Sequence, residues 1–167
     1  RRALVDCKDE DIIIISDADE IPNPEILKEL DTLSLDNTIY SLAQPMYSYY
    51  INMLSDSDWH GSKIGLYKNV KDLSFNEIRG DSSLTTKLSN GGWHLSFMGG
   101  EEMVRKKITS YSARDLVNDQ VLSSIKNNID NDQDVFFRGK LTKVEIDNTY
   151  PDYVLNNLDK YSNMIKQ

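Results

Sequence analysis

The stretch Asp11-Ile-Ile-Ile-Ile-Ser-Asp-Ala-Asp-Glu-Ile-Pro22 decides the fold class of this chain. Four consecutive β-branched residues between polar ends predict a buried strand over residues 11–16. Three carboxylates follow within four residues, in a predicted loop over residues 17–22. In open α/β sheets, ligands bind beyond the carboxyl ends of the strands. This loop is therefore the first candidate for a functional site.

The rest of the chain alternates between helical and extended patterns. Asn23-Pro24-Glu25 combines a capping side chain, a first-turn proline and an early acid, which predicts a helix to about residue 33. Residues 71–90 are polar and turn-rich. Without repeats or a linker, we expect one α/β domain over residues 1–167. The other predicted elements are strands over 38–51 (interrupted at Pro45), 63–70, 84–88, 93–98 and 143–146, and helices over 101–113, 115–127 and from 151.

Composition excludes several classes of protein. The 19 basic and 27 acidic residues give a net charge of −8, which disfavours nucleic acid and anionic membranes as partners. A bound polyanion would need local help, such as a metal ion. The longest apolar run is Ile12 to Ile15, far below the length of a membrane span. The single Cys7 excludes an internal disulfide framework and any Cys-based zinc site.

The clustered carboxylates of the loop repel one another and need a counter-charge. Mn²⁺ or Mg²⁺, held by Asp19 and Asp17, would supply it and could bridge to the oxygens of a diphosphate. The alternative is a solvated acidic turn that caps the next helix. Strand-Asp-x-Asp also opens phosphatases with an aspartyl nucleophile. Ile21 stands where they have Thr or Val, and their later paired-Asp motif is missing, so that hypothesis ranks lower.

A second dense segment runs from Gly91-Gly92-Trp93-His94 to Gly99-Gly100-Glu101-Glu102. The glycines permit close backbone approach to a ligand, and Trp93 offers a flat face for a sugar. His94 could bind a metal or donate to a phosphate. Glu101 or Glu102, at a predicted helix start, is a candidate general base. The alternatives are a core tryptophan, a strand histidine and ordinary N-terminal helix acids.

Aromatic and basic residues elsewhere are weaker candidates. Gln44-Pro45-Met46-Tyr47 and Trp59-His60-Gly61 could line an acceptor site, or pack in the core. Four basic residues are possible diphosphate clamps, although single basic residues are more often solvated. They are Arg79, Lys106, Lys107 and Arg138.

Together these segments resemble glycosyltransferase family 17, the family of the β-1,4-mannosyl-glycoprotein β-1,4-N-acetylglucosaminyltransferase. The resemblance covers almost the whole chain. It rests on Asp11 to Pro22, Gln44-Pro45 with Tyr47, Trp59 with Gly61, Gly91 to His94 with Ser96, Gly99-Gly100, Lys107-Ile-x-Ser110, Asp134-Val-Phe-x-Arg138, and the segment from Ile146-Asp147 to Tyr161.

The resemblance implies a nucleotide-diphospho-sugar transferase (GT-A-like) fold with a single Rossmann-like domain. It also implies inverting, metal-dependent transfer of N-acetylglucosamine or a related sugar, from a UDP donor such as UDP-GlcNAc to a glycan hydroxyl.

The resemblance also assigns roles to residues. Asp19 would bind the metal ion, Asp17 the ribose or a metal-bound water, and Glu20 would orient the loop. His94 would be a third ligand or a diphosphate donor. Glu102, or Glu101, would be the base, because Gly-Gly-Glu-Glu is similar to the Gly-Gly-Glu-Asp of inverting galactosyltransferases. The expected substrate-binding residues are Trp93, Trp59, Tyr47, Gln44, Gly99 and Gly100, with Arg79 at the diphosphate.

The chain departs from the family pattern in two places. Only sixteen residues precede Asp17, so we expect a C-terminal part of the catalytic domain that lacks the N-terminal βαβ units. Residues 112–115 lack a histidine that family members often carry there. A non-catalytic carbohydrate- or metal-binding remnant is therefore the alternative function. The sequence leaves open the oligomeric state and the location, which is cytoplasmic for a bacterial or viral protein and the Golgi lumen for a eukaryotic relative.

Overall fold

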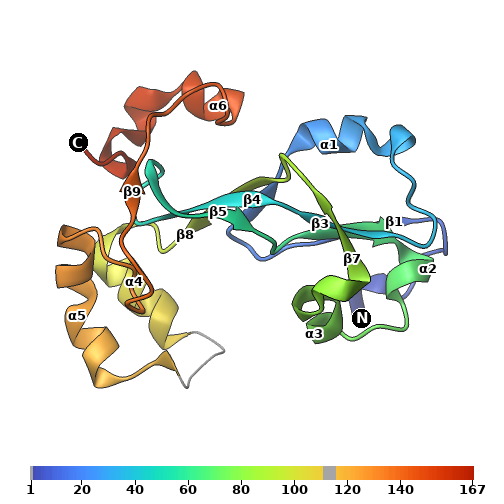
Figure 1. Cartoon of the computed structure of the whole chain (residues 1–167), viewed down its shortest axis with the longest axis horizontal. Coiled ribbons are helices and arrows are strands. Elements are labelled where there is room, and N and C mark those ends of the chain that lie inside the picture. The colour runs from blue at the N-terminus through green and yellow to red at the C-terminus, as the bar shows by residue number, and fades with distance from the viewer. Residues whose placement is uncertain (1, 111–115) are drawn as a thin grey trace. The chain divides into compact units, whose positions relative to one another are not determined.

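Figure 1 shows a computed structural model of the chain, which describes residues 2–110 and 116–167. Helices and strands are mixed along the chain, which confirms the α/β class. The chain divides into two compact units, described here one at a time. The first comprises Arg1–Pro45 and Asp58–His94, and the second Met46–Ser57 and Leu95–Gln167.

The first unit is built on a four-stranded sheet in the order β1-β6-β3-β7. Its strands are β1 (Ile12–Ile15), β6 (Lys63–Leu66), β3 (Ile39–Leu42) and β7 (Thr85–Leu88). β6 is antiparallel to both β1 and β3, whereas β7 runs parallel to β3. The sheet is therefore mixed, with β1 at one edge.

Short helices cover both faces of this sheet (Figure 1). They are α1 (Pro24–Lys28), α2 (Tyr67–Val70) and α3 (Phe75–Gly80), with 3₁₀ turns η1 (Arg2–Leu4), η2 (Leu30–Thr32) and η3 (Ser82–Leu84). Ile13 and Ile15 of β1 pack with Val70 of α2 and Ile78 of α3. On the other face, Ile26 of α1 packs with core residues of β3 and β6.

The predicted isoleucine strand is confirmed, but its burial differs from the expectation. Ile13 and Ile15 are buried, whereas Ile12 and Ile14 are exposed. Successive strand residues point to opposite faces. Only the face toward α2 and α3 is covered along this edge strand, so half of the isoleucines remain at the surface.

A second sheet has the strand order β2-β8-β4-β5-β9. Its strands are β2 (Glu20–Pro22), β8 (Gly92–Ser96), β4 (Gln44–Ser48), β5 (Met53–Trp59) and β9 (Thr142–Lys143). In the first unit, β2 is antiparallel to β8, and the register places Glu20 opposite His94. In the second unit, β5 is antiparallel to β9.

The second unit is mainly helical. Its helices are α4 (Gly100–Thr109), α5 (Asp119–Asp130) and α6 (Asp152–Leu155), followed by the 3₁₀ segment η5 (Leu158–Met164). Val104 and Ile108 of α4 pack with Ile125 and Ile129 of α5 around Met53. The side chain of Asn118 caps α5 by accepting a hydrogen bond from the backbone of Val121.

Several element predictions were wrong. Residues 17–22 were expected to be a loop, but β2 forms there because its backbone pairs with β8. Residues 67–70 were expected to extend β6, but form α2 because Val70 turns into the core. β5 and α3 were not predicted. The expected end of one helix and start of the next, over residues 111–115, lie outside the described residues.

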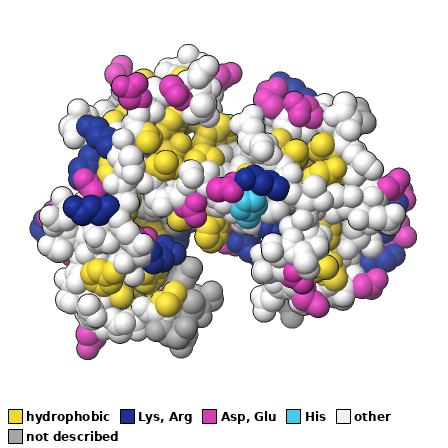
Figure 2. All heavy atoms as spheres, viewed as in Figure 1, with side chains coloured by type: hydrophobic (Ala, Val, Ile, Leu, Met, Phe, Trp, Pro, Cys, Tyr) yellow, Lys and Arg dark blue, Asp and Glu magenta, His cyan; other side chains and the backbone are white. Residues whose placement is uncertain are grey.

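No helix in the described part of the chain is long and apolar enough to cross a membrane. On the face shown in Figure 2, lysine and arginine side chains are interspersed with aspartate and glutamate rather than gathered in one broad basic patch.

Candidate functional site

The acidic loop is a tight turn between β1 and β2. The backbone N–H of Glu20 donates to the carbonyl of Asp17 at 3.0 Å. The backbone N–H of Asp17 donates in return to Oε2 of Glu20, also at 3.0 Å. The hydroxyl of Ser16 donates to the carbonyl of Glu20 at 2.6 Å. These bonds hold the turn in one conformation directly after the strand.

Glu20 is the centre of the site. Its side chain is 0% exposed. The indole Nε1–H of Trp59 donates to Oε1 at 2.8 Å, and the hydroxyl of Ser62 donates to Oε2 at 3.1 Å. The guanidinium of Arg79 donates to both oxygens, at 3.1 and 3.2 Å. A buried carboxylate with this many donors is stable only while they all remain in place.

Arg79 supplies the counter-charge that the clustered carboxylates need. Besides its two bonds to Glu20, its Nη2 donates to Oδ2 of Asp17 at 2.7 Å. The Asp17 side chain is 56% exposed, so this end of the network is open to solvent. Within the protein itself, an arginine therefore provides the positive charge that the sequence led us to assign to a metal ion.

The hydrogen bonds of Glu20 determine its protonation. Burial alone would raise the pKa of this carboxyl, but the bonds from Arg79, Trp59 and the backbone of Asp17, with the charge of Arg79, hold its pKa below the ordinary value of 4.5. Burial by itself would lower the pKa of Arg79, but Glu20, Asp17 and Asp19 together raise it. Both groups are thus ionised at neutral pH.

The lowered pKa of Glu20 predicts acid sensitivity. A group with a depressed native pKa contributes stability above its unfolded pKa, and that contribution is lost as pH falls through the native value. The free energy of unfolding should therefore decrease from about pH 5 downward. Urea titrations at a series of pH values should show a shallower decrease for Glu20→Gln. An equal slope in both proteins would contradict this assignment.

Asp19 and His94 form a second pair on the same face. Nε2 of His94 lies 3.3 Å from Oδ2 of Asp19. The imidazole also packs against the indole of Trp59, with the ring centroids 5.1 Å apart. Nδ1 of His94 is buried and has no hydrogen-bond partner among the described residues. A proton on Nε2, donated to Asp19, fits these surroundings.

An open hollow of about 450 Å³ lies beside this network. Trp59 and Arg79 form parts of its wall, together with His60, Gly61, Asn76 and Gly80. Its lining includes an indole ring and a guanidinium. These are the groups that suit a sugar ring and a phosphate, respectively.

Gln44 and Lys63 lie behind the site. Gln44 is completely buried; its Oε1 is 3.4 Å from the hydroxyl of Ser62, and its Nε2 has no partner among the described residues. The ammonium of Lys63 donates to the hydroxyl of Ser41 and to the carbonyls of His60 and Gly61. Lys63 thereby supports the backbone segment that holds Trp59 against Glu20.

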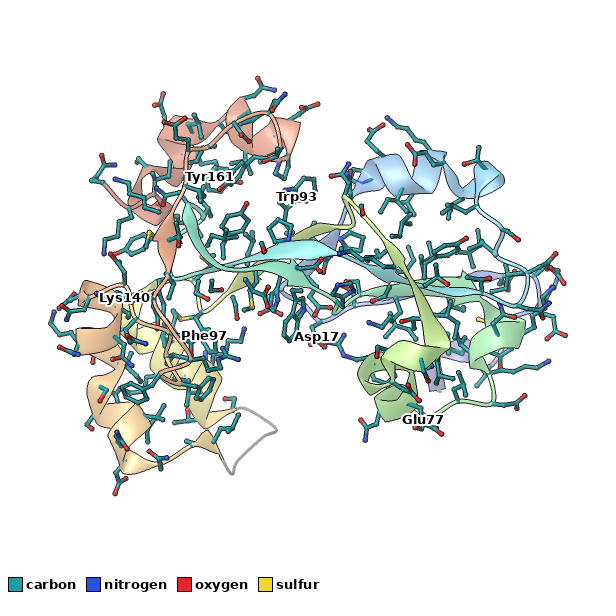
Figure 3. The ribbon with its side chains drawn as sticks, viewed as in Figure 1. Asp17, Glu77, Trp93, Phe97, Lys140 and Tyr161 are labelled. Atoms are coloured by element: carbon teal, nitrogen blue, oxygen red, sulfur yellow. The ribbon has the colours of Figure 1, made fainter. Side chains whose placement is uncertain are left out.

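Trp93 does not join this group. It is 8% exposed and opposes Ile21 in the β2–β8 register. Because neighbouring strand residues point to opposite faces, Trp93 points away from the face of His94 and Glu20. Figure 3 shows the labelled side chains of Trp93 and Asp17 on opposite sides of the strands.

The remaining predicted residues belong to the second unit. Glu101 and Glu102 are exposed in the first turn of α4, where Glu101 pairs with Arg105 at 3.1 Å. Gly99 and Gly100 precede them with positive φ angles of 94° and 78°.

Tyr47, also in the second unit, is buried. Its ring packs against that of Tyr150, with centroids 5.4 Å apart. Among the other predicted clamps, Arg138 pairs with the buried Asp134 at 2.8 Å. Lys107 donates to the hydroxyl of Ser96 at 3.1 Å.

Sequence reasoning missed Ser62, Lys63 and Asn76 as parts of the site. The helix that carries Asn76 and Arg79 had a readable signal, because Ser74 and Glu77 have the spacing of a capping box. The structure shows both bonds of that box. Ser62 and Lys63 lie in an ordinary strand pattern, and only the folded sheet places them behind Glu20.

The donor set determines what kind of ion could bind here. The described residues contain no group of three or more His, Cys, Asp and Glu side chains arranged to hold a metal. Mg²⁺ and Mn²⁺ commonly use one or two carboxylates and complete their shell with water and phosphate oxygens. Asp19 and Asp17 fit that use. A metal-binding histidine usually donates its other N–H to an acceptor, which the buried Nδ1 of His94 lacks.

Comparison with known proteins adds one finding. The sequence profile described as Glycosyltransferase family 17 matches residues 2–164, nearly the whole chain. No curated protein and no solved structure matches the chain.

Proposed function

Because this chain belongs to glycosyltransferase family 17 and the family transfers glycosyl groups, we propose that it uses a nucleotide-diphosphate sugar as donor, assisted by Mn²⁺ or Mg²⁺. The observation that carries this proposal is the carboxylate turn after β1, with Asp17 and Asp19 beside an open hollow that Arg79 and Trp59 line. The mixed α/β architecture is compatible with the GT-A-like fold that we propose for this chain.

The metal ion would be held by Asp19, with Asp17 binding it directly or through water. When bound, the ion supplies positive charge to the diphosphate leaving group. Glu20 keeps the turn in place through its bond from the backbone N–H of Asp17. The unpartnered Nδ1 of His94 favours the second of its two expected roles. In that role its Nε2–H orients Asp19 or donates to the diphosphate, rather than leaving a ring nitrogen to bind the ion.

Donor and acceptor recognition would involve aromatic and acidic side chains. Trp59 forms a wall of the hollow, where its indole face suits the C–H groups of a sugar such as N-acetylglucosamine. We propose UDP-N-acetylglucosamine as donor and a glycan hydroxyl as acceptor. Glu102, or Glu101, would accept the hydroxyl proton as the oxygen attacks the anomeric carbon and the bond to the diphosphate breaks. This is an inverting displacement.

Titration of UDP into the chain, with and without Mn²⁺, tests the proposal. Binding should require Mn²⁺, and Asp19→Ala should weaken it by about tenfold or more, as expected for a lost metal ligand. Glu102→Gln should retain UDP binding but lower sugar transfer by about 10²-fold, the contribution of a general base. Unchanged Mn²⁺-dependent binding in Asp19→Ala would rule out the metal site. Metal-dependent UDP binding without transfer of any sugar would support the alternative of a non-catalytic remnant.

A further inference from the structure

The hydrogen bonds of Arg79 divide it into a fixed part and an exchangeable part. Its Nη1 and Nη2 each donate one N–H to the two oxygens of Glu20, at 3.2 and 3.1 Å. Glu20 is fully buried and also holds Trp59 and Ser62. This two-point contact fixes the plane of the guanidinium. Arg79 therefore keeps its position whether or not its other donors are used.

Asp17 accepts a hydrogen bond from the N–H of Arg79 that a ligand would need. Because Glu20 already takes one Nη2–H, the bond at 2.7 Å to Asp17 uses the other. In a guanidinium, that second Nη2–H lies parallel to Nε–H. Such a pair of parallel donors matches the spacing of two phosphate oxygens. Asp17 thus blocks half of a bidentate phosphate site on a side chain that borders the hollow.

Asp17 is also the member of the network that can leave. Its side chain is 56% exposed, against 20% for Arg79 and 0% for Glu20. Because Asp17 is the solvent-exposed partner, exchanging this contact for another cation costs less than exchanging any contact of the buried Glu20. Glu20, by contrast, cannot exchange its partners without leaving a buried charge unpaired.

We propose that Asp17 and a phosphate compete for the same edge of Arg79, so that Asp17 acts as an internal plug of the diphosphate site. When a divalent cation attracts Asp17, the Nε–H and Nη2–H pair opens toward the hollow and takes a phosphate. Cation and diphosphate therefore bind cooperatively through Arg79. This inference rests on the proposed function for the identity of the ligand, a sugar-linked diphosphate, but not for the competition itself.

Calorimetry with inorganic pyrophosphate, in the presence of a chelator, tests the competition without any sugar chemistry. Asp17→Asn should bind pyrophosphate about tenfold to a hundredfold more tightly than the wild type, the effect of one charge-assisted hydrogen bond. Asp19→Asn is the matched control, because it removes the same charge from the same turn and leaves the bond between Asp17 and Arg79 in place. Equal affinities of the two variants, or no pyrophosphate binding by either, would overturn the proposal.

Two substitutions of Arg79 test its own part in the competition. Arg79→Lys keeps a positive charge near Glu20 but loses the parallel donors, so pyrophosphate affinity in the Asp17→Asn background should fall again. Full retention of the affinity would show that a point charge suffices, and would also overturn the proposal. In titrations with Mn²⁺ alone, Arg79→Gln should bind the ion more tightly than the wild type, because Asp17 is released. Circular dichroism checks that this variant keeps the native fold. A chain that passes these tests yet transfers no sugar would support the non-catalytic alternative over the proposed function and leave this inference standing.

Discussion

Glu20→Ala is expected to lower the free energy of unfolding by about 3–5 kcal/mol, the cost of breaking a buried ion pair from one side. The substitution removes both bonds of Arg79 to the buried carboxylate and leaves its guanidinium, on a side chain that is 20% exposed, paired with the solvent-facing Asp17. It also removes the acceptor of the Trp59 indole N–H and of the Ser62 hydroxyl. Urea unfolding followed by circular dichroism measures the loss.

A matched control separates this effect from the general removal of a carboxylate. Glu10 pairs with Lys68 at 3.2 Å, but its side chain is 74% exposed. Glu10→Ala should therefore change the free energy of unfolding by no more than about 1 kcal/mol. If the two variants lost similar amounts, Glu20 would not be the centre of a buried network.

Gly61→Ala is expected to damage the site as strongly, although it adds only a methyl group. A Cβ at this position would lie 1.7 Å from Oε1 of Glu20 and 2.3 Å from Nε1 of Trp59. Neither atom can retreat without breaking the 2.8 Å bond between them. Overpacking of this kind costs about 1–3 kcal/mol by itself, and the displaced carboxylate adds to it. We expect the Mn²⁺-dependent binding of UDP to be lost together with this stability.

Gly80→Ala provides the comparison for Gly61→Ala, because a Cβ at residue 80 would meet no atom within 4 Å. Its stability should stay within about 0.5 kcal/mol of the wild type. A double-mutant cycle sharpens the test. Gly61→Ala should cost less in the Glu20→Ala background, where the colliding carboxylate is absent, with a coupling of about 1–3 kcal/mol. Additive costs would mean that Gly61 and Glu20 act independently.

The parts of the fold that the sequence predicted are those with a local physical cause. Ile12 to Ile15 form a strand because four β-branched side chains favour extended backbone, and Asn23-Pro24 starts a helix because its side chain caps the first turn. The strand Glu20–Pro22, which pairs with β8, has no such local cause. Three residues carry no periodicity, and their extended shape comes from a partner strand far along the chain.

The same division runs through the candidate site. The sequence by itself determined that carboxylates follow a strand end, and that Trp59, His94 and Arg79 are residues of suitable chemistry. Only the tertiary structure decided that Arg79, 59 positions from Glu20 along the chain, neutralises the turn, and that Trp93 points away from it. The physical reason is the distance along the chain over which each effect acts. Strand propensity and capping act between neighbouring residues, whereas the pairing of a buried charge depends on which distant side chains the sheet and its helices bring within hydrogen-bond distance.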